Sequence, residues 1–161
     1  MKYKIKAYNL QELGQRQNQE DSLFPALGKS TSDDRLFVLC DGMGGHEKGE
    51  VASATVCETI SGTILSEWNP NEALSDELFL QGLSAAYDAL DAKDNGEERK
   101  MGTTLTFLCL HTNGATVAHI GDSRVYQLRP ASKKSLARIV FRTQDHSLVN
   151  DLVKIGEITE E

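Results

Sequence analysis

Four short clusters contain the side chains with the clearest chemical potential. The densest of them reads Asp41-Gly42-Met43-Gly44-Gly45-His46, so that an acid and then glycines follow an apolar run. A buried strand would hold the carboxylate in place, and glycines let a backbone approach a ligand closely. A strand-to-helix turn with Asp41 as the helix cap fits the same residues, so both interpretations stay open at this point.

The second cluster combines Arg16 with Glu20 and Asp21. Paired carboxylates offer oxygen ligands to a hard divalent cation, and a nearby arginine can hold a phosphate through two N–H groups. The third and fourth clusters are Gly121-Asp122-Ser123-Arg124 and Asp145-His146-Ser147. Taken singly, each of these three clusters also fits an ordinary polar surface loop or a capped turn.

The remaining reactive side chains do not form a recognisable site in the sequence. The cysteines, Cys40, Cys57 and Cys109, lie among apolar residues, are odd in number and form no CxxC pair. We therefore expect buried free thiols in a reducing cytoplasm rather than disulfides or a thiolate zinc site. The four histidines lack regular metal-ligand spacing, and the phosphate-binding sequence G-x-x-x-x-G-K-[ST] does not occur.

The composition narrows the class of protein further. The chain has 161 residues and a formal net charge of −7, which argues against general nucleic-acid binding. No apolar run reaches the roughly 20 residues that span a bilayer, so we expect neither a membrane span nor a secretory signal. Twelve acids and two bases lie between Glu47 and Glu98, whereas six bases and no acid lie between Arg124 and Arg142. These stretches fit two solvated surfaces, or a basic surface that meets an anionic partner.

Hydrophobic periodicity indicates the elements that must position the four clusters. Alternating and short apolar runs predict strands, and apolar residues at i+4 spacing predict helices. Strands joined by short turns form antiparallel sheet, and two helices grouped between strands favour an α+β fold in a single domain of residues 1–161. We expect strands at 2–8, 22–27, 36–40, 104–110, 115–120, 124–128 and 136–142, and helices at 47–68, 72–92 and 148–155.

In this order along the chain, the clusters resemble the bacterial branch of the PP2C (PPM) family of metal-dependent protein serine/threonine phosphatases. The resemblance covers nearly the whole chain, and five motifs in register carry it. They are Arg16-x-x-x-Glu20-Asp21, Phe37-Val38-Leu39-Cys40-Asp41-Gly42-Met43-Gly44-Gly45, Met101-Gly102-Thr103-Thr104, Gly121-Asp122-Ser123-Arg124 and Asp145-His146-Ser147-Leu148-Val149.

The resemblance implies an α/β/β/α sandwich of two antiparallel sheets flanked by helices, with two Mn²⁺ or Mg²⁺ ions at one edge. In the family pattern Asp41 bridges the two ions and the carbonyl group of Gly42 binds one of them. Glu20 contacts the same ion through water, with support from Asp21. Asp122 resembles a ligand of a third, weaker metal ion.

The resemblance also implies the reaction, with Arg16 and Asp41 as catalytic residues. A water activated by the ions attacks the phosphorus atom of a phosphoserine or phosphothreonine ester, and Arg16 holds the phosphate. The implied partners are phosphoproteins modified by a serine/threonine kinase in the cytoplasm, with no nucleic-acid or membrane partner. Met43 stands where eukaryotic relatives have a histidine, so the acid for the leaving group stays unassigned.

One departure from the family pattern concerns two later metal aspartates. Neither an S-D-G motif nor a late Asp-Asn pair occurs, so we expect an incomplete family domain that is marginally stable and nearly inactive alone. Two functions stay open: a phosphatase that needs the full domain, or a catalytically inactive fragment that binds a partner or regulates. A generic nucleotide-binding loop is the weakest alternative. We also expect Asp41 to lie close to Glu20, and unpaired strand edges beside 36–40 or 115–120.

Overall fold

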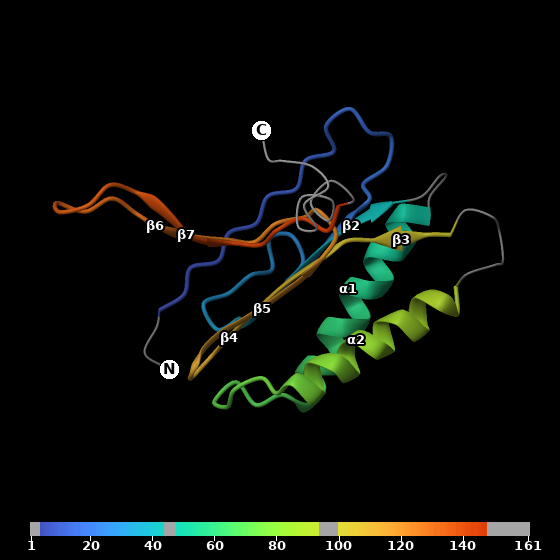
Figure 1. Cartoon of the computed structure of the whole chain (residues 1–161). Helices are drawn as coiled ribbons and strands as arrows, with labels where there is room; N and C mark the ends of the chain where they lie inside the picture. Colours follow the sequence, from blue (N-terminus) through green and yellow to red (C-terminus); the bar gives the residue numbers. More distant parts are fainter. Residues whose placement is uncertain (1–3, 44–47, 94–99, 148–161) are drawn as a thin grey trace, which may run out of the picture.

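The computed structural model describes residues 4–43, 48–93 and 100–147. Within these residues, a five-stranded antiparallel sheet has two helices packed on one side of it (Figure 1). The strand order is β1-β2-β4-β5, and β3 pairs with the end of β2. The elements are β1 (Asp21–Phe24), β2 (Leu36–Met43), α1 (Lys48–Glu67), α2 (Asp76–Asp91), β3 (Gly102–Thr103), β4 (Leu105–His111), β5 (Gly114–Ile120), β6 (Tyr126–Arg129) and β7 (Arg138–Arg142).

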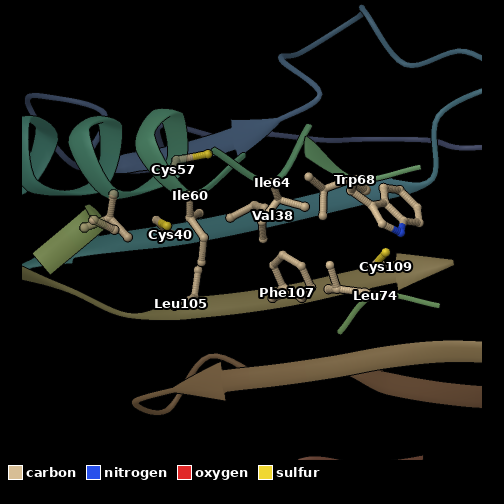
Figure 2. Packing of buried hydrophobic residues seen from close by; sticks show 13 residues of the cluster. Val38, Cys40, Cys57, Ile60, Ile64, Trp68, Leu74, Leu105, Phe107 and Cys109 are labelled. Carbon is tan, nitrogen blue, oxygen red and sulfur yellow. The ribbon is translucent and has the colours of Figure 1, made fainter. Parts of the chain in front are cut away.

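The hydrophobic core lies between the main sheet and α1. Because side chains alternate along a strand, β2 and β4 each present every second residue to the helix. Figure 2 shows this layer, in which side chains of the sheet meet Ile60 and Ile64 of α1. From α2, Phe79 adds an edge-to-face contact with Phe107, with ring centroids 5.1 Å apart. The buried apolar side chains of β2 and β4 are Leu36, Val38, Cys40, Leu105, Phe107 and Cys109.

The second sheet is the β6–β7 hairpin, which lies across the opposite face of the main sheet. A cavity of about 490 Å³ separates the two sheets and is lined by Leu108 and Leu110 on one side and by Tyr126 and Phe141 on the other. Beyond this contact the hairpin extends away from the main sheet and both helices (Figure 1). The α+β class with two antiparallel sheets is therefore confirmed.

Several predicted boundaries differ from the structure. The helix expected from residue 72 begins at Asp76, because the Ser75 side chain accepts a hydrogen bond from the Leu78 N–H and caps it. The strand expected at 22–27 ends at Phe24, since Pro25 has no N–H to continue the ladder. Residues 4–8 alternate between exposed and half-buried as predicted, but they pair with no strand in the described chain.

The sequence predicts a strand edge beside 36–40 or beside 115–120, and one of the two is found. β2 is paired on both sides, by β1 and β4, so the edge does not lie beside 36–40. β5 stands at the end of the sheet among the described residues, as expected for 115–120. The helix predicted at 148–155 lies outside the described residues. In the described part of the chain, neither helix is both long and apolar enough to cross a membrane.

Candidate active site

The candidate site is built where β1 and β2 run side by side. Asp21 is the cross-strand partner of Asp41, so two acids lie opposite each other at the end of this strand pair. The backbone carbonyl of Glu20 accepts a hydrogen bond from the N–H of Gly42 at 3.0 Å, which sets Glu20 next to Asp41. Asp41 lies inside β2, well before α1 begins at Lys48, so the interpretation of Asp41 as a helix cap is wrong.

The surroundings of Asp21 change its acidity. Burial, and then the nearby charge of Asp41 and a hydrogen bond with its carboxyl group, raise the pKa of Asp21 above its ordinary value of 3.8. Glu20 adds to the rise, and the guanidinium of Arg16 opposes it. The site is thus a concentration of negative charge that one arginine only partly compensates.

Arg16 reaches this cluster from a preceding loop. Its Nη1 donates a hydrogen bond to Oε2 of Glu20 at 3.2 Å, while 77% of its side chain stays exposed. Exposure leaves the other N–H groups of the guanidinium accessible to a ligand, and Glu20 limits the directions in which the side chain can point. The predicted grouping of Arg16 with the two acids at 20 and 21 is therefore present in the structure.

Gly42 and Gly49 allow the first turn of α1 to lie directly against the site. A Cβ atom added at Gly42 would lie 1.9 Å from the carbonyl oxygen of Gly49, closer than two atoms can approach. A Cβ atom at Gly49 would meet the carboxyl group of Glu20 at 3.1 Å. Position 42 thus requires glycine because the backbone of Gly49 lies against it. The sequence pattern instead suggested that a ligand approaches the backbone at this position.

Thr104 links the strand that carries Asp41 to the third cluster, a link that sequence reasoning missed. The N–H of Asp41 donates to Oγ1 of Thr104 at 3.1 Å, and the N–H of Thr104 donates to the carbonyl of Asp41 at 2.9 Å. The same Oγ1 is hydrogen-bonded to the hydroxyl of Ser123 at 2.7 Å. Asp122, next to Ser123, is exposed on this turn. The motif Met101-Gly102-Thr103-Thr104 offered the signal for such a role.

The third and fourth clusters are joined to each other. Arg124 donates two hydrogen bonds to the carboxylate of Asp145, one from Nε and one from Nη2. The N–H of His146 donates to the carbonyl of Gly121 at 2.9 Å. Arg124 holds the pKa of Asp145 below its ordinary value. The two motifs therefore act as one structural unit that supports the turn bearing Asp122.

The oxygen atoms of the site are of the type that binds a hard cation. Carboxylates of Asp21, Asp41 and Glu20, with the carbonyl group of Gly42, are the oxygen ligands that Mg²⁺ and Mn²⁺ prefer. Burial and then the nearby charge of Asp41 raise the pKa of Asp21, and a cation would offset the part of this rise that comes from charge. Within residues 4–43, 48–93 and 100–147, no three acidic, histidine or cysteine side chains converge as a complete metal site. The predicted metal roles of these residues and of Asp122 stay predictions.

The structure also tests the predictions for the cysteines. Cys40, Cys57 and Cys109 are free and buried, as expected. Burial raises the pKa of the Cys109 thiol to about 12, and the neighbouring Cys57 thiol raises that of Cys40. Raised pKa values keep the thiols of Cys40 and Cys109 protonated at neutral pH, so these two side chains are poor nucleophiles. His46 lies outside the described residues.

Known proteins supply the remaining identification. The sequence profile described as protein phosphatase 2C matches residues 12–156. Protein phosphatase PhpP of Streptococcus pneumoniae is 34% identical over 140 residues, which cover 78% of this chain and 49% of that relative. This chain thus spans about half the length of such curated relatives.

Two solved structures share the fold. The serine/threonine phosphatase PstP/Ppp of Mycobacterium tuberculosis has a TM-score of 0.67 and 35% identity, over 89% of this chain and 55% of that one. A catalytic domain of PstP in complex with two manganese ions has a TM-score of 0.66 and 33% identity, over 89% of this chain and 56% of that one. With the profile match and the five motifs, these similarities establish that the chain belongs to the protein phosphatase 2C family.

Proposed function

We propose that this chain supplies the first metal-binding and phosphate-binding residues of a protein serine/threonine phosphatase. The observation that carries the proposal is the facing pair Asp21 and Asp41, where burial and then the neighbouring charge raise the pKa of Asp21, with Arg16 and Glu20 beside it. The solved relative with two manganese ions supports a divalent cation for these oxygens. The same proposal assigns residues 1–161 to one domain. It also takes the substrate to be a phosphoprotein modified by a kinase.

The residues have distinct tasks in this proposal. Asp41, Asp21 and Glu20 would hold the cation, together with the carbonyl group of Gly42, and Asp122 would take part in a weaker site. When bound, divalent cations supply acidity to a water molecule and positive charge near the phosphoryl oxygens. Arg16 binds and orients the phosphate of phosphoserine or phosphothreonine through its exposed guanidinium. Thr104 fixes the backbone of Asp41 because it is hydrogen-bonded to both the N–H and the carbonyl group of that residue.

Hydrolysis of p-nitrophenyl phosphate with and without Mn²⁺ tests the proposal, on this chain and on a form extended at its C-terminus. We expect Mn²⁺-dependent turnover by the extended form, and Asp41→Asn in that form should lower it by about a hundredfold or more. Asp88→Asn is the matched control, because it makes the same chemical change on the exposed face of α2. Equal activity of the two variants, or turnover that a metal chelator does not reduce, would refute the assignment.

The alternative function predicts a different pattern. A catalytically inactive fragment that binds or regulates would show no turnover in either length, yet would still bind a phosphoprotein. Binding of a phosphoserine peptide without hydrolysis by both forms would therefore favour that alternative over catalysis.

A further inference from the structure

The outer part of the β6–β7 hairpin, residues 129–138, presents four cations that have no ion-pair partner among the described residues. Arg129, Lys133, Lys134 and Arg138 are all exposed, and the hairpin between them contains no acid. The ion pair at the base of the hairpin uses Arg124, which is bound to Asp145 and belongs to the unit described above. The four outer cations are thus available to a partner.

The tip of the hairpin is an ordered turn and not a loose loop. Ser132 and Ser135 exchange backbone hydrogen bonds of 2.8 and 3.4 Å, and their hydroxyl groups lie 3.0 Å apart. The hydroxyl of Ser132 also accepts the N–H of Lys134 at 3.2 Å. Lys133 and Lys134 are therefore the two residues at the end of a closed turn, which fixes where their side chains begin.

The next two cations are set directly opposite each other. Arg129 and Arg138 are cross-strand partners in β6 and β7. Like charges in this position destabilise a hairpin, and a lone two-stranded ribbon is only marginally stable. At about 3.3 Å per residue, this pair lies about 10 Å behind the turn. An arrangement that is unfavourable in isolation becomes favourable when an anionic chain lies between or along the arginines.

The chemistry of the partner follows from charge and position. Outside residues 124–142 the chain carries 24 acids and 11 bases, so the protein as a whole would repel a long polyanion such as nucleic acid or an anionic membrane. A short acidic polypeptide segment can contact the hairpin alone. Exposed Leu128 and Ile139, which face each other across the ribbon, add apolar area that suits a polypeptide.

We infer that the β6–β7 hairpin is a docking arm for acidic segments of the phosphoprotein substrate, remote from the phosphate that is removed. The inference rests on the proposed function for the identity of the partner, because a phosphatase must hold a protein substrate. It assigns specificity for acidic sequence to Lys133, Lys134, Arg129 and Arg138, and leaves the chemistry at Asp41 unchanged.

The direct test measures binding of a fluorescein-labelled, glutamate-rich peptide by fluorescence anisotropy. Lys133→Glu with Lys134→Glu should weaken binding about tenfold at low salt, which corresponds to the loss of two exposed ion pairs. The effect should shrink at high salt, where screening weakens such pairs. Lys29→Glu with Lys93→Glu is the matched control, since both lysines are exposed elsewhere and the net charge changes equally. This control should bind as the wild type does.

A third variant separates charge from folding of the hairpin. Arg129→Glu replaces the repulsive pair with Arg138 by an opposite-charge pair, so the hairpin should be at least as stable while binding weakens. Equal binding by the two double variants would overturn the inference, as would tighter binding to a single-stranded oligonucleotide or to anionic vesicles than to the peptide.

The binding assay needs no turnover, so its result is independent of the proposed catalysis. In an active enzyme, the double variant at the tip should lower kcat/KM for a phosphopeptide with an acidic tract and leave hydrolysis of p-nitrophenyl phosphate unchanged. Loss of both activities to the same degree would contradict docking and would point to damage at the active site. Activity toward neither substrate in the wild type would count against the proposed function alone.

Discussion

The packing of α1 against the site predicts that Gly42 tolerates no side chain. In Gly42→Ala the new Cβ atom would lie 1.9 Å from the Gly49 carbonyl oxygen and 2.8 Å from that of Glu20. Both neighbours are backbone atoms, so no side-chain rotation removes the clash. Gly42 is not among the glycines with positive φ, so the cost is steric and not conformational.

The magnitude follows from the size of the clash. Overpacking a tight site costs about 1–3 kcal/mol, and backbone contacts on two sides place Gly42→Ala at about 3 kcal/mol or above. For a chain of this size, each kcal/mol corresponds to about 2–4 °C, so the melting temperature should fall by about 6–12 °C. Gly62→Ala is the matched control: no atom lies within 4 Å of its added Cβ atom, and Gly62 is exposed within α1.

Thermal unfolding followed by circular dichroism measures both variants. The control should be more stable than the wild type by about 0.5–1 kcal/mol, because alanine favours a helix over glycine. The same chemical change thus acts in opposite directions at two positions. If Gly42→Ala unfolds at the wild-type temperature, the close contact between β2 and α1 is wrong, and with it the way in which Glu20 is held next to Asp41.

Three further predictions concern single side chains. Arg16→Ala should raise KM or lower kcat/KM for a phosphopeptide and change stability by only about 0.5 kcal/mol, because the side chain is 77% exposed; a large fall in melting temperature with unchanged kinetics would contradict a phosphate-binding role. Because Arg124 lowers the pKa of Asp145, the stabilisation from this pair is present above the ordinary pKa of 3.8 and is lost as pH falls through the lowered pKa. An NMR titration should return the Asp145 pKa toward 3.8 in Arg124→Gln, and an unchanged value would refute the ion pair as the cause. Cys109, whose thiol pKa is raised to about 12, should resist iodoacetamide at neutral pH in the folded protein and react in urea, as judged by mass spectrometry; modification of the folded protein would show that the thiol is accessible.

The sequence alone predicted much of the local structure and led to the expectation of a cation. The apolar i+4 spacing from Ala52 to Trp68 predicts α1 almost to its ends, and the short apolar run before Asp41 predicts β2, because both depend on which residues must be buried together. Oxygen donors in the first two motifs predict a hard cation whatever the fold, since affinity for such ions depends on donor chemistry.

Only the tertiary structure decided how the motifs combine. That Asp21 faces Asp41 is a matter of strand register, and register depends on packing and turn geometry over the whole sheet. The link from Asp41 through Thr104 to Ser123, and the pairing of Arg124 with Asp145, join residues far apart along the chain, for which local spacing carries no signal. The requirement for glycine at Gly42 likewise appears only when α1 lies against β2, because a steric contact between distant segments exists only in the folded chain.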